Sequence, residues 1–336
     1  MKFRKIAAIF AAMAMTAGLL TGCSSGSGSS GTGSTTAAAK EEVKWPTSTV
    51  TIVVPAGAGG GTDLLARVFA EKLTDKLGQT FVVSNVTGAG GSNGTSAVLD
   101  AEPDGNTILF YHNGMATNAV TGVTDYSYKD FTVGPHVVTD NATGFYVSSS
   151  APYKTYPELI EYCKAHPGEV TMGVEVGGFT YMMVKSFEQA FGVEFNLVDV
   201  GGNADKCTAL LGGHIDIMPN QYSTAKGYIE SGDFIALGFP CEKRFEVYPD
   251  VPTAKEQGVD WLYNGYEFGF WFPGDTDPAI VNALDKAVKE LFDNNEVQDD
   301  ILKIGNEGSY IDPAGYAEMY GKIQDQYAQI WESADK

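Results

Sequence analysis

The sequence predicts an α/β protein built from two similar units, each a mostly parallel sheet flanked by helices. Short apolar runs rich in β-branched residues alternate along the chain with segments whose apolar residues recur at helical spacing. This alternation is typical of strands joined by crossover helices, and it occurs twice. Several of the expected strand-to-helix junctions are also rich in glycine, which lets a ligand approach the backbone closely.

The first unit begins with TVTIVV at residues 49–54, whose continuous apolar pattern predicts a buried parallel strand. The helix expected over 63–77 carries apolar residues three or four positions apart, and Gly78 ends it. Further strands are predicted at 80–85 and 107–113. A short helix with a glycine-rich entry is expected between them.

The second unit repeats the pattern. Strands are predicted at 144–150, 170–176, 194–202, 215–219 and 234–239, and helices at 155–166, 177–191 and 204–213. A strand at 267–273 and an amphipathic helix at 279–292 are expected to return to the first unit. The predicted organisation is therefore lobe I at 45–146 plus 267–336, with lobe II at 147–266 inserted. The hinge is expected near 144–149 and 267–272.

The N-terminus has the features of an export leader. Three basic residues precede an apolar run that is too short to span a membrane comfortably. The run ends in Leu-Thr-Gly-Cys, a lipobox, so the chain resembles a bacterial lipoprotein with a signal peptide at 1–22 and lipidation of Cys23. The Gly/Ser-rich tract through about residue 44 is expected to be a flexible tether. An ordinary cleaved leader with an incidental cysteine is the alternative.

Charge and cysteine content exclude several classes. The net charge of −20 repels nucleic acid and anionic headgroups, so neither is an expected partner and any anion site has to be local. Beyond Cys23 the chain has Cys163, Cys207 and Cys241, which allow at most one disulfide. A Cys163–Cys207 bond and free buried thiols both remain open. Without a CxxC pair or a His/Cys cluster, no metal or other cofactor is expected.

Glycine-rich junctions occur at 57–61, 177–178 and 201–202, and a further glycine-rich stretch, 88–94, follows the second strand. Helix N-termini present unpaired N–H groups and a partial positive charge, and in α/β sheets they lie beside the ligand crevice. Two such junctions from opposite lobes could hold one carboxylate between them without a lysine or arginine in either loop. The alternative is that these glycines only permit tight turns.

Nucleotide binding and catalysis are less well supported. The segment 57–62 lacks the last glycine of a dinucleotide fingerprint, and the next strand ends in Ser84-Asn85 without an acid for a ribose. No Gly-Lys-Ser/Thr of a phosphate loop follows. His112 is the one histidine expected near the crevice, but it has no nucleophile partner and no GxSxG is present. An enzyme is therefore not expected.

Three blocks resemble a known family: TIVVPAGAGGGTDLLARVFAEKL, KRFEVYPDVPTAKEQGV and FGFWFPGDTDPAIVNALDKAV. They are similar to the periplasmic receptors of tripartite tricarboxylate transporters, the TctC or Bug family. The resemblance implies a type II periplasmic-binding-protein fold whose two lobes close on a ligand. It also implies capture of a small organic carboxylate, delivery to a membrane permease, and a grip on the carboxylate by loops matching 56–63 and 177–180.

The expected site combines these loops with residues at neighbouring strand ends. The candidate ligand-binding residues are Ala56, Gly57, Ala58, Gly59, Gly60, Gly61, Thr62, Asp63, Gly90, His112, Asn113, Gly177, Gly178, Phe179, Thr180, Gly201, Gly202, Asn203, Tyr222 and Tyr266. Phe179 adds an apolar wall, and Glu175 would repel a second carboxylate if it faces the crevice. Together with Asp199-Val200-Gly201, where the family usually carries a Pro-Tyr-Lys-like segment, this favours a monocarboxylate, an amino acid or an acid with an aromatic tail.

The predicted function is that of a monomeric, lipid-anchored, extracytoplasmic solute-binding protein serving a tripartite tricarboxylate-type permease. A sensory carboxylate receptor that signals to a membrane kinase would use the same residues, so the sequence leaves that alternative open. An extracytoplasmic enzyme acting on a small acid is the third possibility, and it would need a base beside a nucleophile.

Overall fold

The computed structural model describes residues 44–245, 247–263 and 265–334. The predicted signal peptide, Cys23 and all but the last residue of the predicted tether lie outside the described residues. Within the described part, no helix is long and apolar enough to cross a membrane.

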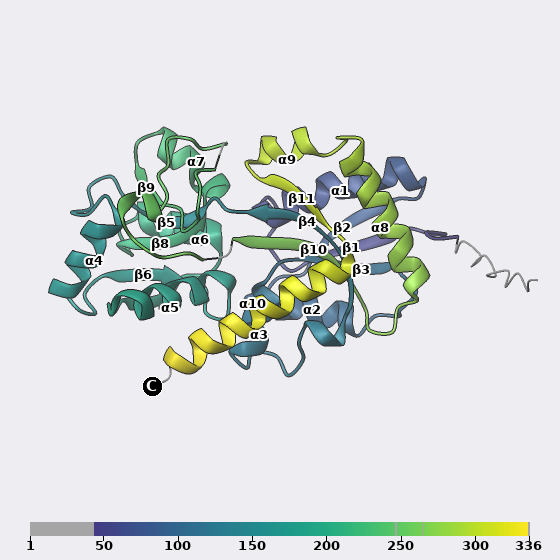
Figure 1. Ribbon diagram of the computed structural model, residues 1–336, viewed down its shortest axis with the longest axis horizontal. Helices are drawn as coiled ribbons and strands as arrows, with labels where there is room; N and C mark the ends of the chain where they lie inside the picture. The colour runs from purple at the N-terminus through teal and green to yellow at the C-terminus, as the bar shows by residue number, and fades with distance from the viewer. Residues whose placement is uncertain (1–43, 246, 264, 335–336) are drawn as a thin grey trace, which may run out of the picture. The chain divides into compact units, whose positions relative to one another are not determined.

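The first sheet has the strand order β11-β4-β10-β3-β1-β2 (Figure 1). Its strands are β1 (Val50–Val54), β2 (Phe81–Asn85), β3 (Thr107–Tyr111), β4 (Thr132–Asp140), β10 (Tyr266–Phe272) and β11 (Glu307–Ile311). β1 pairs in parallel with β2 and β3, whereas β10 runs antiparallel to β3 and β4, and β11 antiparallel to β4. Most of these strands therefore point in one direction, and their carboxyl ends share one edge.

The second sheet has the order β7-β6-β8-β5-β9. Its strands are β5 (Thr143–Ser148), β6 (Thr171–Val174), β7 (Asn196–Asp199), β8 (Ile217–Gln221) and β9 (Phe234–Gly238). β6 is parallel to β7 and β8, and β5 is antiparallel to both of its neighbours. In each sheet, the strand that arrives from the other sheet, β5 or β10, is inserted antiparallel. The predicted class, two α/β lobes with helix-flanked sheets, is confirmed.

The connections between the sheets are shorter than the sequence suggested. The boundary expected after residue 146 falls inside β5, all of which belongs to the second sheet. The expected hinge segments, 144–149 and 267–272, consist almost entirely of paired strand residues. Only residues 141–142 separate β4 from β5, and the return passes through the stretch before Tyr266. Paired strands resist changes in backbone dihedrals, so these unpaired links are better placed to bend.

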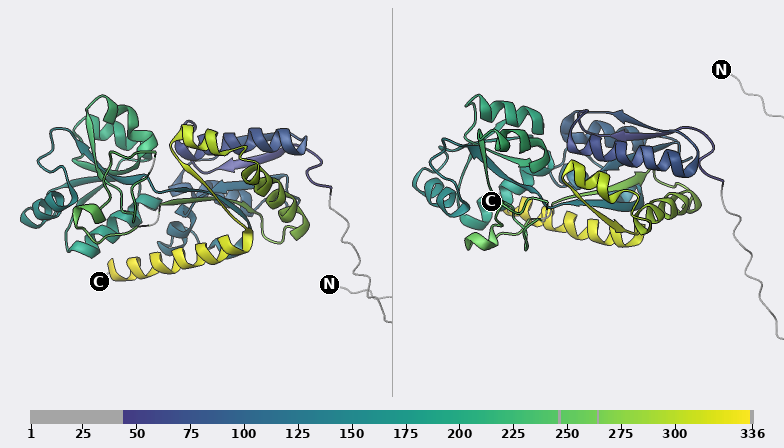
Figure 2. Two further views of the ribbon diagram at one scale, coloured as in Figure 1. Left: turned by 45° about the horizontal axis from the view of Figure 1, so that its top comes forward. Right: turned by 90° about the horizontal axis from the view of Figure 1, so that it is seen from above.

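Helices cover both sheets. They are α1 (Gly61–Leu77), α2 (Ser92–Leu99), α3 (Gly114–Val120), α4 (Tyr156–Ala165), α5 (Phe179–Phe191), α6 (Asn203–Leu211), α7 (Tyr222–Glu230), α8 (Pro278–Asp293), α9 (Gln298–Ile304) and α10 (Pro313–Ala334), with 3₁₀ turns η1 (Ala89–Gly91), η2 (Tyr128–Asp130) and η3 (Lys255–Gln257). The long C-terminal helix α10 packs on α3 and β4 and also on α5 (Figure 2). It therefore contacts both lobes.

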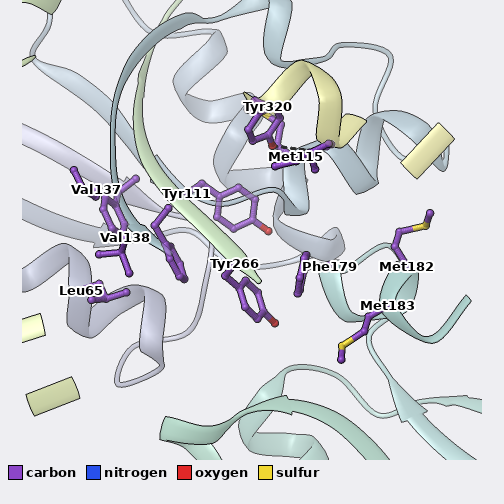
Figure 3. Close-up of a cluster of buried hydrophobic side chains, with 14 of the residues drawn as sticks. Leu65, Tyr111, Met115, Val137, Val138, Phe179, Met182, Met183, Tyr266 and Tyr320 are labelled. Atoms are coloured by element: carbon purple, nitrogen blue, oxygen red, sulfur yellow. Dashed lines mark hydrogen bonds between the residues drawn. The ribbon is translucent and has the colours of Figure 1, made fainter. Parts of the chain in front are cut away.

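Buried aromatic rings form much of the core. Phe69 of α1 lies 6.0 Å from Phe110 and 5.7 Å from Phe270, ring centroid to ring centroid, so the helix packs directly onto β3 and β10. Figure 3 shows that the apolar cluster continues to Tyr266 and Phe179, whose rings are 4.0 Å apart. Because Phe179 begins α5, this contact joins the two lobes. Cys163 and Cys207 are buried free thiols, which resolves the open alternative in favour of no disulfide.

Candidate functional site

A cavity of about 480 Å³ lies where the carboxyl ends of strands from both sheets meet. It is lined by the loop after β1, the glycines before α2, the ends of β3 and β8, the loops after β6 and β7, and the start of β10. Of the candidate residues, Ala56, Gly57, Ala58, Gly59, Gly60, Gly61, Thr62, Gly90, His112, Gly178, Phe179, Thr180, Gly202, Asn203 and Tyr266 line it. The two distant glycine loops therefore do share one cavity.

The other five candidates, Asp63, Asn113, Gly177, Gly201 and Tyr222, do not line this cavity. Tyr222 instead packs against Tyr248, with ring centroids 3.9 Å apart, and turns toward the loop after β9. The lining also includes residues that were not among the candidates: Pro55, Thr87, Gly88, Tyr111, Glu175, Ala204, Asp205, Gln221 and Thr224.

Asp63 shapes the first glycine loop from behind. Its carboxylate accepts hydrogen bonds from the Gly59 N–H at 2.8 Å, from Arg67 Nε at 2.9 Å and from Asn85 Nδ2 at 2.9 Å. Burial disfavours the charged carboxylate, but these bonds outweigh it and lower the pKa of Asp63. Its oxygens are therefore occupied, and Asp63 fixes the loop from behind without lining the cavity.

The loops of the two lobes also touch each other. Gly90 has a positive φ of 61°, and a methyl group placed on it would lie 3.0 Å from the carbonyl carbon and oxygen of Gly177. Tyr111 and Asn118 each donate a hydrogen bond to the Gly90 carbonyl, at 3.1 and 3.0 Å. Gly177 therefore contributes to closure between the lobes, not to the cavity wall.

A buried lysine lies immediately behind the second loop. Lys206 of α6 is 1% exposed, and its Nζ donates a hydrogen bond to Thr180 Oγ1 at 3.1 Å. Burial lowers the pKa of Lys206 to about 8, and the negative charge of Glu175 partly opposes that shift. An ammonium group can only donate, so Thr180 accepts from Lys206 and its own hydroxyl hydrogen is free for another acceptor.

Lys206 was absent from the expected site, although the sequence carried a signal for it. Lys206, Cys207 and Leu210 are the buried residues of α6, spaced so that they occupy one helical face. A lysine on the apolar face of a helix is rarely buried without a partner. The glycine loops contain no basic residue, as predicted, but the ammonium group of Lys206 lies directly behind the second loop.

His112 presents a neutral donor to the cavity. The Gly114 N–H donates to His112 Nδ1 at 2.9 Å, so Nδ1 is unprotonated and the neutral ring carries its hydrogen on Nε2. Burial lowers the pKa of His112 to about 3. At physiological pH this side chain can donate a hydrogen bond, but it contributes no positive charge.

A chain of side-chain hydrogen bonds joins the two sheets at the base of the cavity. Gln221 Nε2 donates to the Asp140 carboxylate at 2.6 Å, and Asn203 Nδ2 donates to Gln221 Oε1 at 3.1 Å. Asp140 ends β4 of the first sheet, whereas Gln221 ends β8 of the second. Burial raises the pKa of Asp140 to about 6, although the bond from Gln221 opposes the shift.

This raised pKa predicts a pH dependence of stability. The folded state binds a proton at Asp140 that the unfolded chain releases between pH 4 and 6, so this group's contribution to the free energy of unfolding falls as the pH rises through that window. Between pH 4 and 7, we expect the free energy of unfolding of wild type, measured in urea, to fall by up to about 2 kcal/mol relative to that of Asp140→Asn. A constant difference between the two proteins across that range would contradict this assignment.

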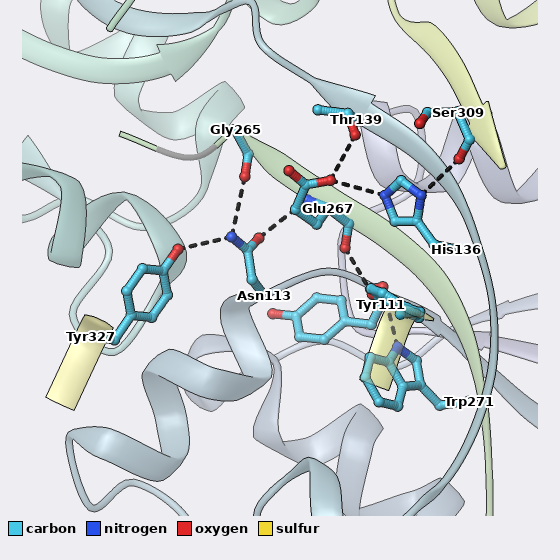
Figure 4. Close-up of polar contacts among 10 residues, drawn as sticks. Tyr111, Asn113, His136, Thr139, Gly265, Glu267, Trp271, Ser309 and Tyr327 are labelled. Carbon is cyan, nitrogen blue, oxygen red and sulfur yellow. Dashed lines mark hydrogen bonds and ion pairs between the residues drawn. The ribbon is translucent and has the colours of Figure 1, made fainter. Parts of the chain in front are cut away.

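Asn113 supports the return link between the sheets (Figure 4). Its amide donates to the Gly265 carbonyl at 3.1 Å and to the Tyr327 hydroxyl at 2.8 Å, and its oxygen accepts from the Glu267 N–H at 3.3 Å. Asn113 is fully buried. It therefore fixes β10 and α10 to the end of β3, which explains why it lies next to His112 but faces away from the cavity.

Comparison with known proteins agrees with this geometry. The family described as "Tripartite tricarboxylate transporter family receptor" (TctC) matches residues 65–332. The chain belongs to this family. It is 29% identical over 259 residues to protein BugT from Bordetella pertussis, covering 75% of this chain and 79% of that one.

Two solved structures share the fold of this TctC receptor. One is Rpa4515 of R. palustris with adipate, with a TM-score of 0.79 and 28% identity, covering 87% of this chain and 98% of that one. The other is MatC (Rpa3494) from Rhodopseudomonas palustris with bound malate, with a TM-score of 0.75 and 26% identity, covering 85% and 100%. The family and these neighbours are binding proteins by description, and both ligands are small carboxylates.

Proposed function

We propose that this TctC receptor captures a small organic carboxylate between its two lobes, outside the cytoplasm, and delivers it to the permease of a tripartite tricarboxylate-type transporter. The observation that carries the proposal is the convergence of two helix N-termini on one cavity. Gly60 is the N-cap of α1 and Gly178 the N-cap of α5, and both line the cavity. No side chain caps either helix by a hydrogen bond, so the first amides of α1 and α5 remain free to bind an anion. The Glu175 carboxylate lies beside the start of α5, so α1 is the less obstructed of the two helix ends.

The side chains around these amides suit a carboxylate. Thr62, Thr180 and His112 add neutral donors, and buried Lys206 supplies a positive charge behind Thr180. The adipate of the Rpa4515 structure and the malate of the MatC structure belong to the same chemical class. Lipid attachment at Cys23 remains part of the proposal and rests on the leader pattern of the sequence.

Binding is expected to favour closure of the lobes, because a ligand held from both sides stabilises only the closed form. Gly90 against Gly177 and Tyr266 against Phe179 are contacts between the lobes that opening would separate. The links at 141–142 and before Tyr266 are the proposed bending points.

A thermal-shift screen of the mature protein without its tether tests the proposal. We expect at least one carboxylate from a panel of mono-, di- and tricarboxylates to raise the melting temperature, since a ligand at a hundred times its dissociation constant adds about 2.7 kcal/mol to the free energy of unfolding. The corresponding alcohols and amides serve as controls and should have little effect. A panel in which no carboxylate shifts the transition, or in which the amides shift it equally, would contradict carboxylate capture.

A further inference from the structure

We propose that Glu175 selects a ligand that carries a cationic group next to its carboxylate, so that the receptor takes an ammonium carboxylate such as an amino acid in preference to a plain acid. This inference rests on the proposed capture of a carboxylate and names the class of carboxylate. It depends on where the Glu175 side chain lies, on which charges surround it and on what a closed cavity tolerates.

Glu175 follows β6 and lines the cavity. Its Oε2 atom is close to the start of α5, because a methyl group placed on Gly178 would lie 3.2 Å from it. Among the residues that the structure describes, none forms a hydrogen bond or a close ion pair with this carboxylate, since Lys206 directs its Nζ to Thr180. The Glu175 carboxylate is therefore a cavity-facing group without a bonding partner.

The charge of Glu175 acts across the cavity on the first lobe. Burial raises the pKa values of Tyr111 and Tyr266, and the negative charge of Glu175 raises both further. Both tyrosines line the cavity from the first lobe. Burial also raises the pKa of Glu175 itself; Lys206 opposes this shift, and Asp199 and Asp205 add to it. A cation entering the cavity would meet a negative potential at this end.

The charges decide which carboxylates fit. Lys206 is the one cation next to this end of the cavity in the described part of the chain, and none of the lining residues is a lysine or arginine. Asp205 also lines the cavity, but it is exposed and accepts a hydrogen bond from the Gly202 N–H, which leaves Glu175 as the lining carboxylate without a partner. Counting only Glu175, Lys206 and the ligand, a plain monocarboxylate would place two carboxylates beside one ammonium group, and a dicarboxylate would place three. A ligand ammonium group would restore neutrality and give Glu175 the partner that it lacks, which avoids the cost of burying an unpaired charge.

The arrangement of the cavity allows both ligand groups to be held at once. The amides of the first glycine loop and the Thr180 hydroxyl would take the carboxylate, and Glu175 would take the ammonium group. The rings of Phe179 and Tyr266, whose centroids are 4.0 Å apart, form an apolar wall for the rest of the ligand. The recognised unit is then the amino acid backbone, and the wall accommodates its side chain.

Matched ligand pairs test this inference by titration calorimetry. The probes are glutamate with glutarate, leucine with 4-methylpentanoate, and phenylalanine with 3-phenylpropionate, each measured on wild type, Glu175→Gln and Asp199→Asn. Asp199 is the matched control, since it is a neighbouring acid that does not line the cavity. We expect wild type to bind at least one amino acid about tenfold or more tightly than its partner, and Glu175→Gln to reduce that ratio at least tenfold. Asp199→Asn should leave the ratio within about twofold, because an exposed charge is screened.

Two results would overturn the inference. One is a wild type that binds the plain acids as tightly as the amino acids, and the other is a preference for amino acids that Glu175→Gln leaves unchanged. In both cases at least one of these carboxylates binds, so the proposed capture of a carboxylate would stand. If a wider panel of amino acids and plain acids gave no binding at all, the proposed function would fail together with the inference. Unchanged melting temperatures of the variants show that they are folded.

Discussion

Gly60→Val is expected to abolish carboxylate binding while leaving the fold intact. Gly60 is the N-cap of α1 with φ −78° and ψ 167°, an extended conformation that valine adopts readily. A Cβ atom there would approach only the Gly57 carbonyl oxygen, at 3.3 Å, so we expect a loss of less than about 1 kcal/mol in the free energy of unfolding.

The effect on binding should be far larger because the new side chain lies at the cavity wall beside the first N–H groups of α1. A carboxylate that can no longer reach two of these groups loses bonds worth about 1.5–3 kcal/mol each, which corresponds to more than about a hundredfold in affinity. Calorimetry with the carboxylate that most raises the melting temperature measures the loss.

Gly227→Val is the matched control for this variant. Gly227 is exposed on α7, has no neighbour within 4 Å of the position of a Cβ, and does not line the cavity. We expect Gly227→Val to bind like wild type. Normal binding by Gly60→Val would show that the first glycine loop is only a connection between β1 and α1.

The glycine loops could be predicted from sequence because their signal is local. A β-rich run, a cluster of glycines and an amphipathic pattern follow one another within about 25 residues, and the rule that ligands lie beyond strand ends then places them at one edge. The same reasoning gave the two-sheet class. It did not give β4 (TVGPHVVTD) or β11 (EGSYI), because neither sequence alternates clearly between apolar and polar residues: β4 contains glycine and proline, and β11 contains glycine and serine.

Residues whose role depends on a distant partner could not be assigned in this way. Asp63 and Asn113 are polar residues next to the predicted crevice, so they looked like ligand contacts. Asp63 is occupied by Arg67 and Asn85, and Asn113 by groups more than 150 positions away in the chain. Which polar residues face a ligand and which hold the loops is decided by tertiary hydrogen bonds that no local pattern encodes.

Lys206→Met is expected to weaken carboxylate binding by about thirtyfold or more without destabilising the protein. Lys206 does not line the cavity and its Nζ donates to Thr180 Oγ1, so we expect it to act as a positioning residue: it leaves the Thr180 hydroxyl free to donate and places a positive charge behind it. Burying this ammonium group costs free energy in the folded protein, and the same burial lowers its pKa to about 8. A methionine of similar length removes that cost, but it also removes the positive charge that opposes the raised pKa of Glu175, so we expect a melting temperature close to that of wild type.

Three measurements separate this role from a merely structural one. Lys206→Met should lose affinity for the carboxylate but not for its neutral amide, because only the carboxylate gains from the charge. Lys206→Met and Thr180→Val should be strongly non-additive in a double-mutant cycle, because the lysine acts partly through that hydroxyl. Lys226→Met, which removes an exposed lysine of α7 3.8 Å from Glu230, should bind like wild type. Equal losses for the carboxylate and its amide would mean that Lys206 maintains the shape of the second loop, and the electrostatic assignment would then be wrong.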